Sequence, residues 1–364
     1  MNQALCVSCA LKDSALLEVE DGLLELGELC RTLGLIVQDK IILSSSQIFA
    51  PTYISRPMAE ELAITREALD VEIVVFNNDL SPAQVRNLEK ILDCAVMDRT
   101  EVILKIFQIH ARTQEAKLQV EIAQLKYTLP RLKRMWLHLS RIEGGVVGYS
   151  SKGPGEKQIE LDRRYISNRI AKLSKKLKQI DTRRETRRHK RVESSLPLVS
   201  IVGYTNAGKT TLLNILAKEK LLAEDKLFAT LSPVTRKVYL AEQDYALVSD
   251  TVGFIKDLPH HLVASFHTTL QEIEYTDIIL LLQDISHRNY QEQIKTVTSI
   301  LGELKVLDKP LLLVFSKIDL LDDNTRMDQL AKAYPEALFI SARNEVGIME
   351  LKKAITSTKE KFEK

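Results

Sequence analysis

The sequence predicts an α/β protein built of three parts. Short runs rich in Val and Ile alternate with helix-like stretches near both ends of the chain, which is typical of α/β domains. Between them, apolar residues recur every three or four positions in two long stretches, which predicts an antiparallel pair of helices. We therefore expect an N-terminal α/β domain over 1–105, a helical hairpin over 106–192 and a second α/β domain over 196–364. The 364 residues are enough for two or three such domains.

Composition excludes some classes of protein and leaves the partners open. Apolar residues make up 45% of the chain, so a core can be buried, and the formal net charge of +2 indicates no partner. The N-terminus lacks the basic and apolar segments of a signal peptide, and the longest apolar runs, such as 278–282, are too short to cross a bilayer. We expect a cytoplasmic protein, with loose membrane association left open.

Cysteine usage indicates a reducing compartment. Cys6 and Cys9 have the spacing of a metal-binding pair, but no second pair and no nearby His follows them, and two ligands do not close a zinc site. We expect these two, with Cys30 and Cys94, to be ordinary core or surface residues with unpaired thiols.

In the first domain, runs rich in Val and Ile predict strands over 33–43, 71–76 and 95–97. Ser81-Pro82 predicts the start of a helix, because Ser is a favoured N-cap and Pro fits the first helical position. Nothing in this domain has the pattern of a catalytic motif.

The second part has the apolar spacing of two long helices, and Pro130 is expected to kink the first of them. A Gly-rich segment over 144–158 separates the helices and predicts a mobile loop. The predicted seams are Leu118, Ile122, Leu125, Leu129, Leu132, Trp136 and Leu139 in the first helix and Ile166, Ile170, Leu173, Leu177 and Ile180 in the second.

The second helix is strongly basic. From 163 to 191 there are thirteen Lys or Arg residues and two acidic ones. A solvated helix face is one explanation. The density favours contact with a nucleic-acid backbone, and the scarcity of aromatic residues favours phosphate contact on folded RNA over base stacking. The candidate RNA-binding residues are Lys152, Lys157, Arg163, Arg164, Arg183, Arg184, Arg187 and Arg188.

The third part repeats the order strand, loop, helix, which predicts a doubly wound, mainly parallel sheet. Its buried-type strands are predicted over 198–202, 278–282, 311–315 and 338–340, and an antiparallel hairpin over 238–240 and 246–248 with a turn at Gln243-Asp244.

Residues 203–210, Gly-Tyr-Thr-Asn-Ala-Gly-Lys-Thr, match the phosphate-binding loop in full. An apolar strand precedes the loop and a helix over 211–218 follows it, which is the context that the motif requires. The glycines permit backbone turns that aim N–H groups at phosphate oxygens, Lys209 reaches the terminal phosphates, and the Thr210 hydroxyl can bind Mg²⁺. The predicted nucleotide contacts are Gly203, Tyr204, Thr205, Asn206, Ala207, Gly208, Lys209, Thr210 and Thr211.

Two later motifs favour guanine. Residues 316–319, Ser-Lys-Ile-Asp, are similar to the Asn-Lys-x-Asp signature, whose Asp accepts two hydrogen bonds that guanine donates and adenine cannot. Ser316 stands where Asn is usual, so we expect loss of the amide that ties the base loop to the phosphate loop, and a somewhat lower affinity. The second motif, Ser341-Ala342-Arg343, follows the next predicted strand and resembles the Ser-Ala-x loop that supports the guanine O6. The predicted base contacts are Ser316, Lys317, Ile318, Asp319, Ser341, Ala342 and Arg343.

Asp250-Thr251-Val252-Gly253 matches the Asp-x-x-Gly switch. Asp250 can hold Mg²⁺ through a water, and the N–H of Gly253 can sense the γ-phosphate. Phe254 follows, where Ras-like proteins carry the glutamine that orients the attacking water. We expect slow intrinsic hydrolysis and a bound partner that completes the site.

A further threonine that reaches the magnesium and the γ-phosphate must lie between the phosphate loop and this switch. Thr230 and Thr235 both qualify by type, and spacing alone does not decide between them. The predicted contacts in this segment are Phe228, Ala229, Thr230, Leu231 and Ser232.

Together these motifs resemble those of the HflX family of ribosome-associated GTPases, over nearly the whole chain. Residues 98–107, Asp-Arg-Thr-Glu-Val-Ile-Leu-Lys-Ile-Phe, resemble the signature at its domain junction. Residues 153–160, Gly-Pro-Gly-Glu-Lys-Gln-Ile-Glu, resemble its hairpin-loop motif, with Lys157 where Thr is usual. The motifs of its Ras-like P-loop GTPase domain are matched by 203–209, 228–231 and 250–255.

The resemblance implies a Mg²⁺-dependent GTPase that binds the large (50S) ribosomal subunit in its GTP form. It implies RNA contacts by the N-terminal domain and the hairpin, and a role in splitting or rescuing stalled ribosomes under stress. It also implies that Thr230 joins Thr210 and Asp250 around Mg²⁺, and that Lys209, Thr230 and Gly253 act in catalysis. We expect a monomer.

Two departures from the family pattern limit these expectations. Residues 53–61 lack its usual Gly-Lys-Gly-Lys stretch, and the chain ends soon after a last predicted helix over 346–364, where many members continue. A GTP-gated RNA- or ribosome-binding module, in which hydrolysis is incidental, stays open as the alternative. An ATPase or kinase would require Asp319 to be irrelevant.

Overall fold

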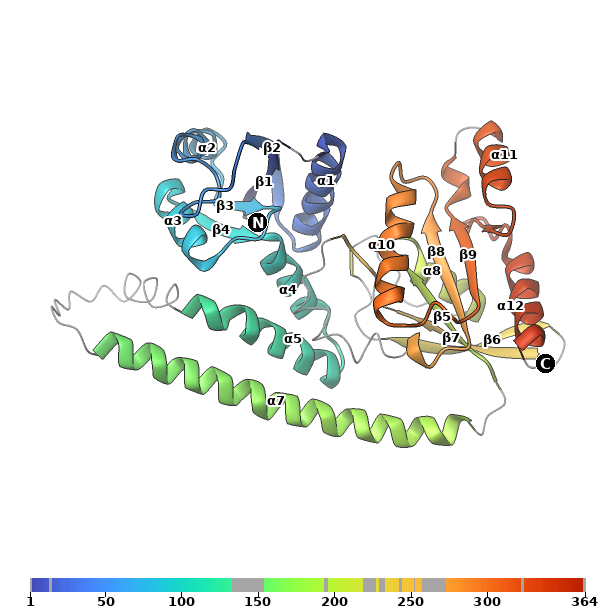
Figure 1. Cartoon of the computed structure of the whole chain (residues 1–364). Coiled ribbons are helices and arrows are strands. Elements are labelled where there is room, and N and C mark those ends of the chain that lie inside the picture. The colour runs from blue at the N-terminus through green and yellow to red at the C-terminus, as the bar shows by residue number, and fades with distance from the viewer. Residues whose placement is uncertain are drawn as a thin grey trace. The chain divides into compact units, whose positions relative to one another are not determined.

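The computed structural model describes residues 2–12, 15–132, 154–192, 196–218, 227–228, 233–241, 244–251, 253–256, 273–321 and 324–362. The chain divides into two compact units, of which the first holds 1–109 and 117–179 and the second 110–116 and 180–364. Figure 1 shows a sheet with helices in each of them. The predicted α/β fold class is confirmed.

The first unit contains a four-stranded parallel sheet in the order β2-β1-β3-β4. Both faces of this sheet are covered. Alternate residues of β1 share a core with α2 and α3, whereas Cys6 between them contacts Cys30 of α1, so α1 lies on the opposite face. The elements are β1 (Gln3–Leu11), α1 (Leu16–Thr32), β2 (Ile36–Ser45), α2 (Arg56–Ala68), β3 (Ile73–Phe76), α3 (Pro82–Leu92) and β4 (Ala95–Asp98).

Strand β1 was not predicted, although it lies at the centre of this sheet. Its sequence from Ala4 to Leu11 is apolar except for Ser8, and its burial on both faces removes the alternation that identifies a half-exposed strand. Cys6, Cys9 and Cys30 are buried free thiols of this core, and Cys94 is a half-buried one.

The predicted start of β2 at Leu33 is wrong by three residues. Helix α1 continues to Thr32, and Gly34 then adopts a left-handed φ of +85°. The N–H of Leu35 donates to the Cys30 carbonyl at 3.0 Å, which closes the helix end before the strand can begin.

Three other strand boundaries of this domain also differ. Strand β2 ends two residues later than predicted, β3 begins two residues later and β4 ends one residue later. The start of α3 is confirmed: the Ser81 hydroxyl accepts from the Gln84 N–H at 3.3 Å, and Pro82 is the first helical residue.

A group of helices follows the sheet: α4 (Arg99–His110), α5 (Gln114–Thr128), a short 3₁₀ turn (Leu129–Arg131) and α7 (Pro154–Val192). Figure 1 shows α5 and α7 running in opposite directions side by side, and Arg169 of α7 binds Glu121 of α5 at 2.8 Å. Four described residues of the predicted seams are buried: Leu118, Ile122, Leu132 and Leu173.

The boundaries of these helices confirm one prediction and correct another. Pro130 interrupts the first predicted helix, because α5 ends at Thr128 and Pro130 lies in the 3₁₀ turn. Helix α7 begins at Pro154, so residues 154–158 are helical rather than part of the Gly-rich loop; Pro is favoured at a first helical position. The rest of that loop, with Trp136 and Leu139, lies outside the described residues.

The junction motif of 98–107 has a structural role in this unit. Asp98, at the end of β4, is fully buried. Its carboxylate accepts from the Glu101 N–H at 2.8 Å, the Tyr127 hydroxyl at 2.8 Å and an Arg131 guanidinium nitrogen at 3.0 Å. A single carboxylate therefore caps α4 and binds the end of α5 to the sheet.

The second unit contains a six-stranded sheet in the order β10-β9-β8-β5-β7-β6, parallel except for the β6–β7 pair. The doubly wound topology is confirmed. Its elements are β5 (Leu198–Gly203), α8 (Lys209–Ala217), β6 (Val234–Ala241), β7 (Asp244–Asp250), β8 (Ile278–Asp284), α10 (Tyr290–Glu303), β9 (Leu311–Ser316), a 3₁₀ turn (Ile318–Leu320), α11 (Asn324–Ala333), β10 (Leu338–Phe339) and α12 (Ile348–Phe362).

Helices cover both faces of this sheet as well. Val314 of β9 packs in the core that includes α8 and α12, whereas its neighbour Phe315 packs with α10 and α11 on the other face. This arrangement places the loops after β5, β7, β8 and β9 at the carboxyl ends of adjacent parallel strands, where α/β sheets bind ligands. Among the described residues, no helix is long and apolar enough to cross a membrane.

Candidate functional site

The predicted phosphate loop connects β5 to the start of α8. Gly203 ends the strand where there is no room for a side chain, since a Cβ there would lie 2.1 Å from the Leu282 carbonyl oxygen of β8. Gly208 has a left-handed φ of +91° and lies directly before α8, which begins at Lys209. The loop therefore turns sharply onto a helix N-terminus, a backbone arrangement that binds anions.

The Lys209 ammonium lies inside this loop. It donates to the carbonyl oxygens of Tyr204 at 2.8 Å and Gly203 at 3.2 Å, and the side chain is buried. Burial lowers the pKa of Lys209 to about 8, against the opposing effect of the Asp250 carboxylate. A buried cation of this kind is well placed to balance the charge of a phosphate group.

Thr210 and Asp250 meet beside the loop. The Thr210 hydroxyl of α8 donates to Asp250 Oδ2 at the end of β7, at 2.7 Å. Asp250 is 1% exposed. A hydroxyl and a carboxylate are hard oxygen donors of the kind that Mg²⁺ prefers, and Mg²⁺ keeps several waters when it binds to one or two such groups. These two residues therefore fit a magnesium site.

The segment after Asp250 is bonded into the phosphate loop by its backbone. The Phe254 N–H donates to the Gly203 carbonyl at 3.1 Å, and the Phe254 carbonyl accepts from the Thr205 N–H at 2.7 Å. The Phe254 ring is 2% exposed. The Thr251 hydroxyl donates to the Ile201 carbonyl of β5 at 2.8 Å. These bonds fix Gly253 against the loop and leave Phe254 with a structural role in the core.

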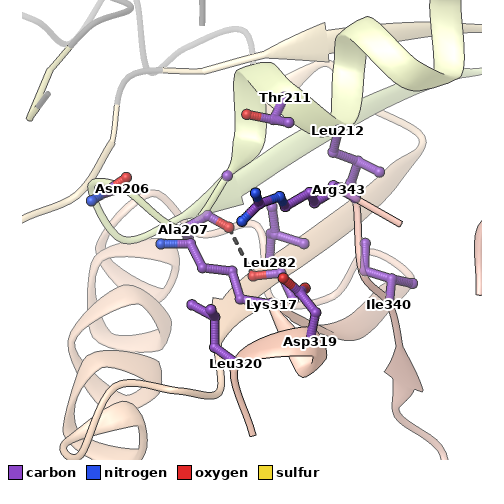
Figure 2. A pocket seen from close by; sticks show the side chains of 13 residues that line it. Asn206, Ala207, Thr211, Leu212, Leu282, Lys317, Asp319, Leu320, Ile340 and Arg343 are labelled. Atoms are coloured by element: carbon purple, nitrogen blue, oxygen red, sulfur yellow. Dashed lines mark hydrogen bonds between the residues drawn. The ribbon is translucent and has the colours of Figure 1, made fainter. Parts of the chain in front are cut away.

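A pocket of about 320 Å³ opens on the other side of the loop (Figure 2). It is lined by the phosphate loop, by the loops after β9 and β10, and by apolar residues beneath them. Its described lining is Asn206, Ala207, Gly208, Thr211, Leu212, Leu282, Ser316, Lys317, Asp319, Leu320, Ile340, Ala342 and Arg343.

Asp319 is held in this pocket by a hydroxyl. The Ser341 hydroxyl donates to Asp319 Oδ1 at 2.6 Å, and the Asn344 N–H donates to the Ser341 oxygen at 3.1 Å. The Lys317 ammonium binds Asp284 Oδ2, at the end of β8, at 2.8 Å. The two guanine motifs are therefore joined to each other by side-chain contacts, with one Asp319 oxygen fixed by Ser341.

The predicted loss of the tie between the base loop and the phosphate loop is wrong. The buried Ser316 hydroxyl lies 2.8 Å from the Ala207 carbonyl oxygen and 3.2 Å from that of Gln283. The dashed line in Figure 2 marks the contact with Ala207. A serine hydroxyl thus connects the same two segments that an asparagine amide would connect, and the somewhat lower affinity stays a prediction.

Sequence reasoning missed four apolar side chains of the base pocket and one polar partner, Asp284. The apolar ones carry no motif of their own, because only packing brings them to the pocket. Asp284 had a signal that was not used, since it directly follows an apolar strand at the carboxyl edge of the sheet. The missed apolar residues are Leu212, Leu282, Leu320 and Ile340.

Several predicted site residues lie outside the phosphate loop and the base pocket described above. Thr235 lies in β6, and its hydroxyl contacts that of Ser249 at 3.4 Å. Phe228 is buried with a φ of +57°. Arg163 and Arg164 are exposed on α7. The positions outside the described residues are Lys152, Ala229, Thr230, Leu231, Ser232 and Val252, and the side chains outside them are those of Lys157, Arg183, Arg184, Arg187 and Arg188.

The loop on a helix N-terminus, the Thr210–Asp250 pair and the base pocket define the class of protein, a P-loop GTPase. Three family models match the chain: "GTP-binding GTPase N-terminal" over 20–108, "GTP-binding GTPase Middle Region" over 110–191 and "50S ribosome-binding GTPase" over 198–317. Each match shows that the segment is similar in sequence to proteins of the family so described.

Curated relatives give the family. The chain is 44% identical over 327 residues to the GTPase HflX of Lacrimispora saccharolytica, covering 90% of this chain and 76% of that protein. It is 42% identical over 319 residues to the GTPase HflX of Escherichia coli strain K12, covering 87% and 74%. The chain belongs to the HflX GTPases, enzymes that hydrolyse GTP.

A solved structure is similar over the whole length. The GTP-binding protein from the hyperthermophilic archaeon Sulfolobus solfataricus, in complex with GDP, matches with a TM-score of 0.52 and 26% identity, covering 100% of each chain. The P-loop GTPase architecture of the second unit is therefore shared with a protein that binds GDP.

Proposed function

We propose that this chain hydrolyses GTP slowly by itself and is stimulated by the ribosome, to which it binds chiefly through the large (50S) subunit. We further propose that it acts in the splitting or rescue of ribosomes, or in stress-linked control of translation. The observation that carries the proposal is the burial of Phe254, whose backbone is bonded to the phosphate loop. A buried ring cannot orient the attacking water, so we propose that a bound partner supplies the positioning group.

The proposed nucleotide contacts follow from the geometry of the site. Asp319 has one oxygen fixed by Ser341, which orients its carboxylate toward the hydrogen-bond donors of guanine. Lys209 supplies a buried positive charge for the β- and γ-phosphates. Gly253 lies beside that ammonium, and its N–H is proposed to donate to the γ-phosphate.

The proposed cofactor is Mg²⁺, which would neutralise charge on the phosphates. Thr210 and Asp250 are the described residues that would hold it, the latter through a water, and their 2.7 Å contact supports this assignment. Thr230 is proposed as the third residue on the grounds of the family resemblance. The contact of Thr235 with Ser249, on a paired strand, favours this choice over Thr235.

The proposed RNA-binding surface is the basic face of α7. Thirteen Lys or Arg residues against two acidic ones lie between 163 and 191, and the described basic side chains of this range are exposed. Opposite charges are too few within this helix to balance them, which favours phosphate contact. The description of the matched G-domain family, a 50S ribosome-binding GTPase, supports the large subunit as the partner.

Multiple-turnover GTP hydrolysis with and without purified large subunits tests this function. We expect the subunits to raise the turnover rate. No stimulation would favour the second candidate, a GTP-gated RNA- or ribosome-binding module in which hydrolysis is incidental, because Phe254 cannot position the water from the place where Ras-like proteins carry a glutamine. We propose a cytoplasmic monomer in either case.

Cosedimentation with ribosomal subunits tests the surface of α7. Neutralising Arg183, Arg184, Arg187 and Arg188 together should weaken binding and flatten its salt dependence, because each lost phosphate contact lowers the slope by about one. A matched control removes the same charge from the exposed residues Lys295, Lys305, Lys332 and Lys353 of the second unit. Equal losses in both variants would mean that only overall charge matters, and would contradict a specific surface on α7.

A further inference from the structure

Thr205, the third residue of the phosphate loop, has a buried hydroxyl without a hydrogen-bond partner among the residues that the structure describes. The residue is 7% exposed, and within the described part of the chain its Oγ1 makes no hydrogen bond. Its backbone N–H is already used, because it donates to the Phe254 carbonyl. A buried hydroxyl without a partner destabilises a protein, and one that lies in an anion-binding loop can bond to a ligand held by that loop.

The surroundings of Thr205 indicate which part of a ligand it faces. A Cβ placed on Gly253 would lie 2.9 Å from the Cα and the Cγ2 of Thr205, and 3.0 Å from the Lys209 ammonium nitrogen. The methyl group of Thr205 and the ammonium of Lys209 therefore meet over the same glycine. The loop residues that line the base pocket are Asn206, Ala207 and Gly208.

Thr205 thus lies at the end of the loop that is remote from the base. Lys209 and Gly253, its two neighbours there, are the residues proposed to contact the γ-phosphate. One branch of its side chain, the methyl group, packs on Gly253, and this contact restricts the rotation of the other branch, the hydroxyl.

We propose that the Thr205 hydroxyl donates a hydrogen bond to a γ-phosphate oxygen and so makes the site prefer GTP over GDP. The inference rests on the proposed use of this loop as the nucleotide site. A hydrogen bond to a charged oxygen is stronger than one between neutral groups, and GDP has no oxygen at that position to accept it. Thr205 is then a specificity-determining residue of the GTPase site.

The affinities of two nucleotides test this role. Thr205→Val keeps the branched shape and removes the hydroxyl, whereas Thr205→Ser keeps the hydroxyl. We would titrate the full chain, without ribosomes, with fluorescent GDP and with a fluorescent non-hydrolysable GTP analogue. Thr205→Val should weaken binding of the analogue about tenfold or more and leave GDP binding within about twofold, and Thr205→Ser should restore most of the loss.

Ser200→Ala is the matched control. Ser200 lies in β5 with a buried hydroxyl that also makes no hydrogen bond among the described residues, and it is outside the phosphate loop. Its removal should leave the ratio of the two affinities unchanged. An equal loss for both nucleotides in Thr205→Val, or no loss for the analogue, would overturn the inference.

The same titrations separate this inference from the proposed function. They contain no ribosomes, so a failure of ribosomal stimulation leaves their outcome intact. If the unaltered chain bound neither nucleotide, the proposed nucleotide contacts and the role of Thr205 would both be overturned.

Discussion

Ser316 offers the sharpest test of the site, because its hydroxyl connects two segments 109 residues apart. Ser316→Ala removes that hydroxyl from a position that is 2% exposed. The single hydroxyl proton is shared between the carbonyls of Ala207 at 2.8 Å and Gln283 at 3.2 Å. The substitution breaks a hydrogen bond and also leaves two buried carbonyl oxygens without a donor. We therefore expect a free-energy loss of about 1–2 kcal/mol.

This cost divides between stability and nucleotide binding. The bond joins two distant parts of the folded chain, so part of its loss should lower the free energy of unfolding by about 1 kcal/mol. The remainder should appear as a less ordered phosphate loop, and 1 kcal/mol corresponds to roughly a fivefold weaker affinity for GDP. Equilibrium urea unfolding measures the first effect and a fluorescence titration with GDP measures the second.

The control is Ser357→Ala, which removes an exposed helical hydroxyl that donates to the Ala354 carbonyl at 3.1 Å. It should change neither quantity by a measurable amount. If Ser316→Ala also left both the unfolding free energy and the GDP affinity unchanged, the hydrogen bond from Ser316 to the phosphate loop would contribute to neither stability nor nucleotide binding. The reasoning that serine replaces the usual asparagine would then be refuted.

Four further outcomes are expected. Lys209→Ala should abolish triphosphate binding, with a loss of about 100-fold or more in a fluorescence titration, because it removes the buried charge of the loop. Asp319→Asn should shift the preference from guanine to xanthine nucleotides in competition assays, since its amide can donate to the 2-oxo group of xanthine. Asp98→Asn should lower the unfolding free energy measured in urea by about 3 kcal/mol, because it leaves the Arg131 charge uncompensated in a buried site. Removing Mg²⁺ with a chelator should stop GTP hydrolysis in a phosphate-release assay, and activity that persisted would contradict the proposed role of the cation.

Local sequence alone determined the kind of site. The phosphate loop could be predicted because its chemistry resides in eight consecutive residues. The backbone requires both of its glycines, since Gly203 has no room for a Cβ and Gly208 has a left-handed φ. The guanine motif was predictable for the same reason, since Asp319 acts through its own carboxylate at the end of a strand. The α/β class followed from strand and helix periods, which are also properties of short segments.

Tertiary structure decided what depends on residues far apart in the sequence. The partner of Ser316 lies in another loop, so the sequence could show a missing amide but not the hydroxyl contact that takes its place. The structural role of the buried Asp98 carboxylate could not be predicted, because its partners Tyr127 and Arg131 come from α5 and the turn after it. Burial on both faces hid the central strand β1, because it erased the alternation on which strand prediction depends. Consecutive residues set the local chemistry of this protein, and packing between distant segments determined how that chemistry is held in place.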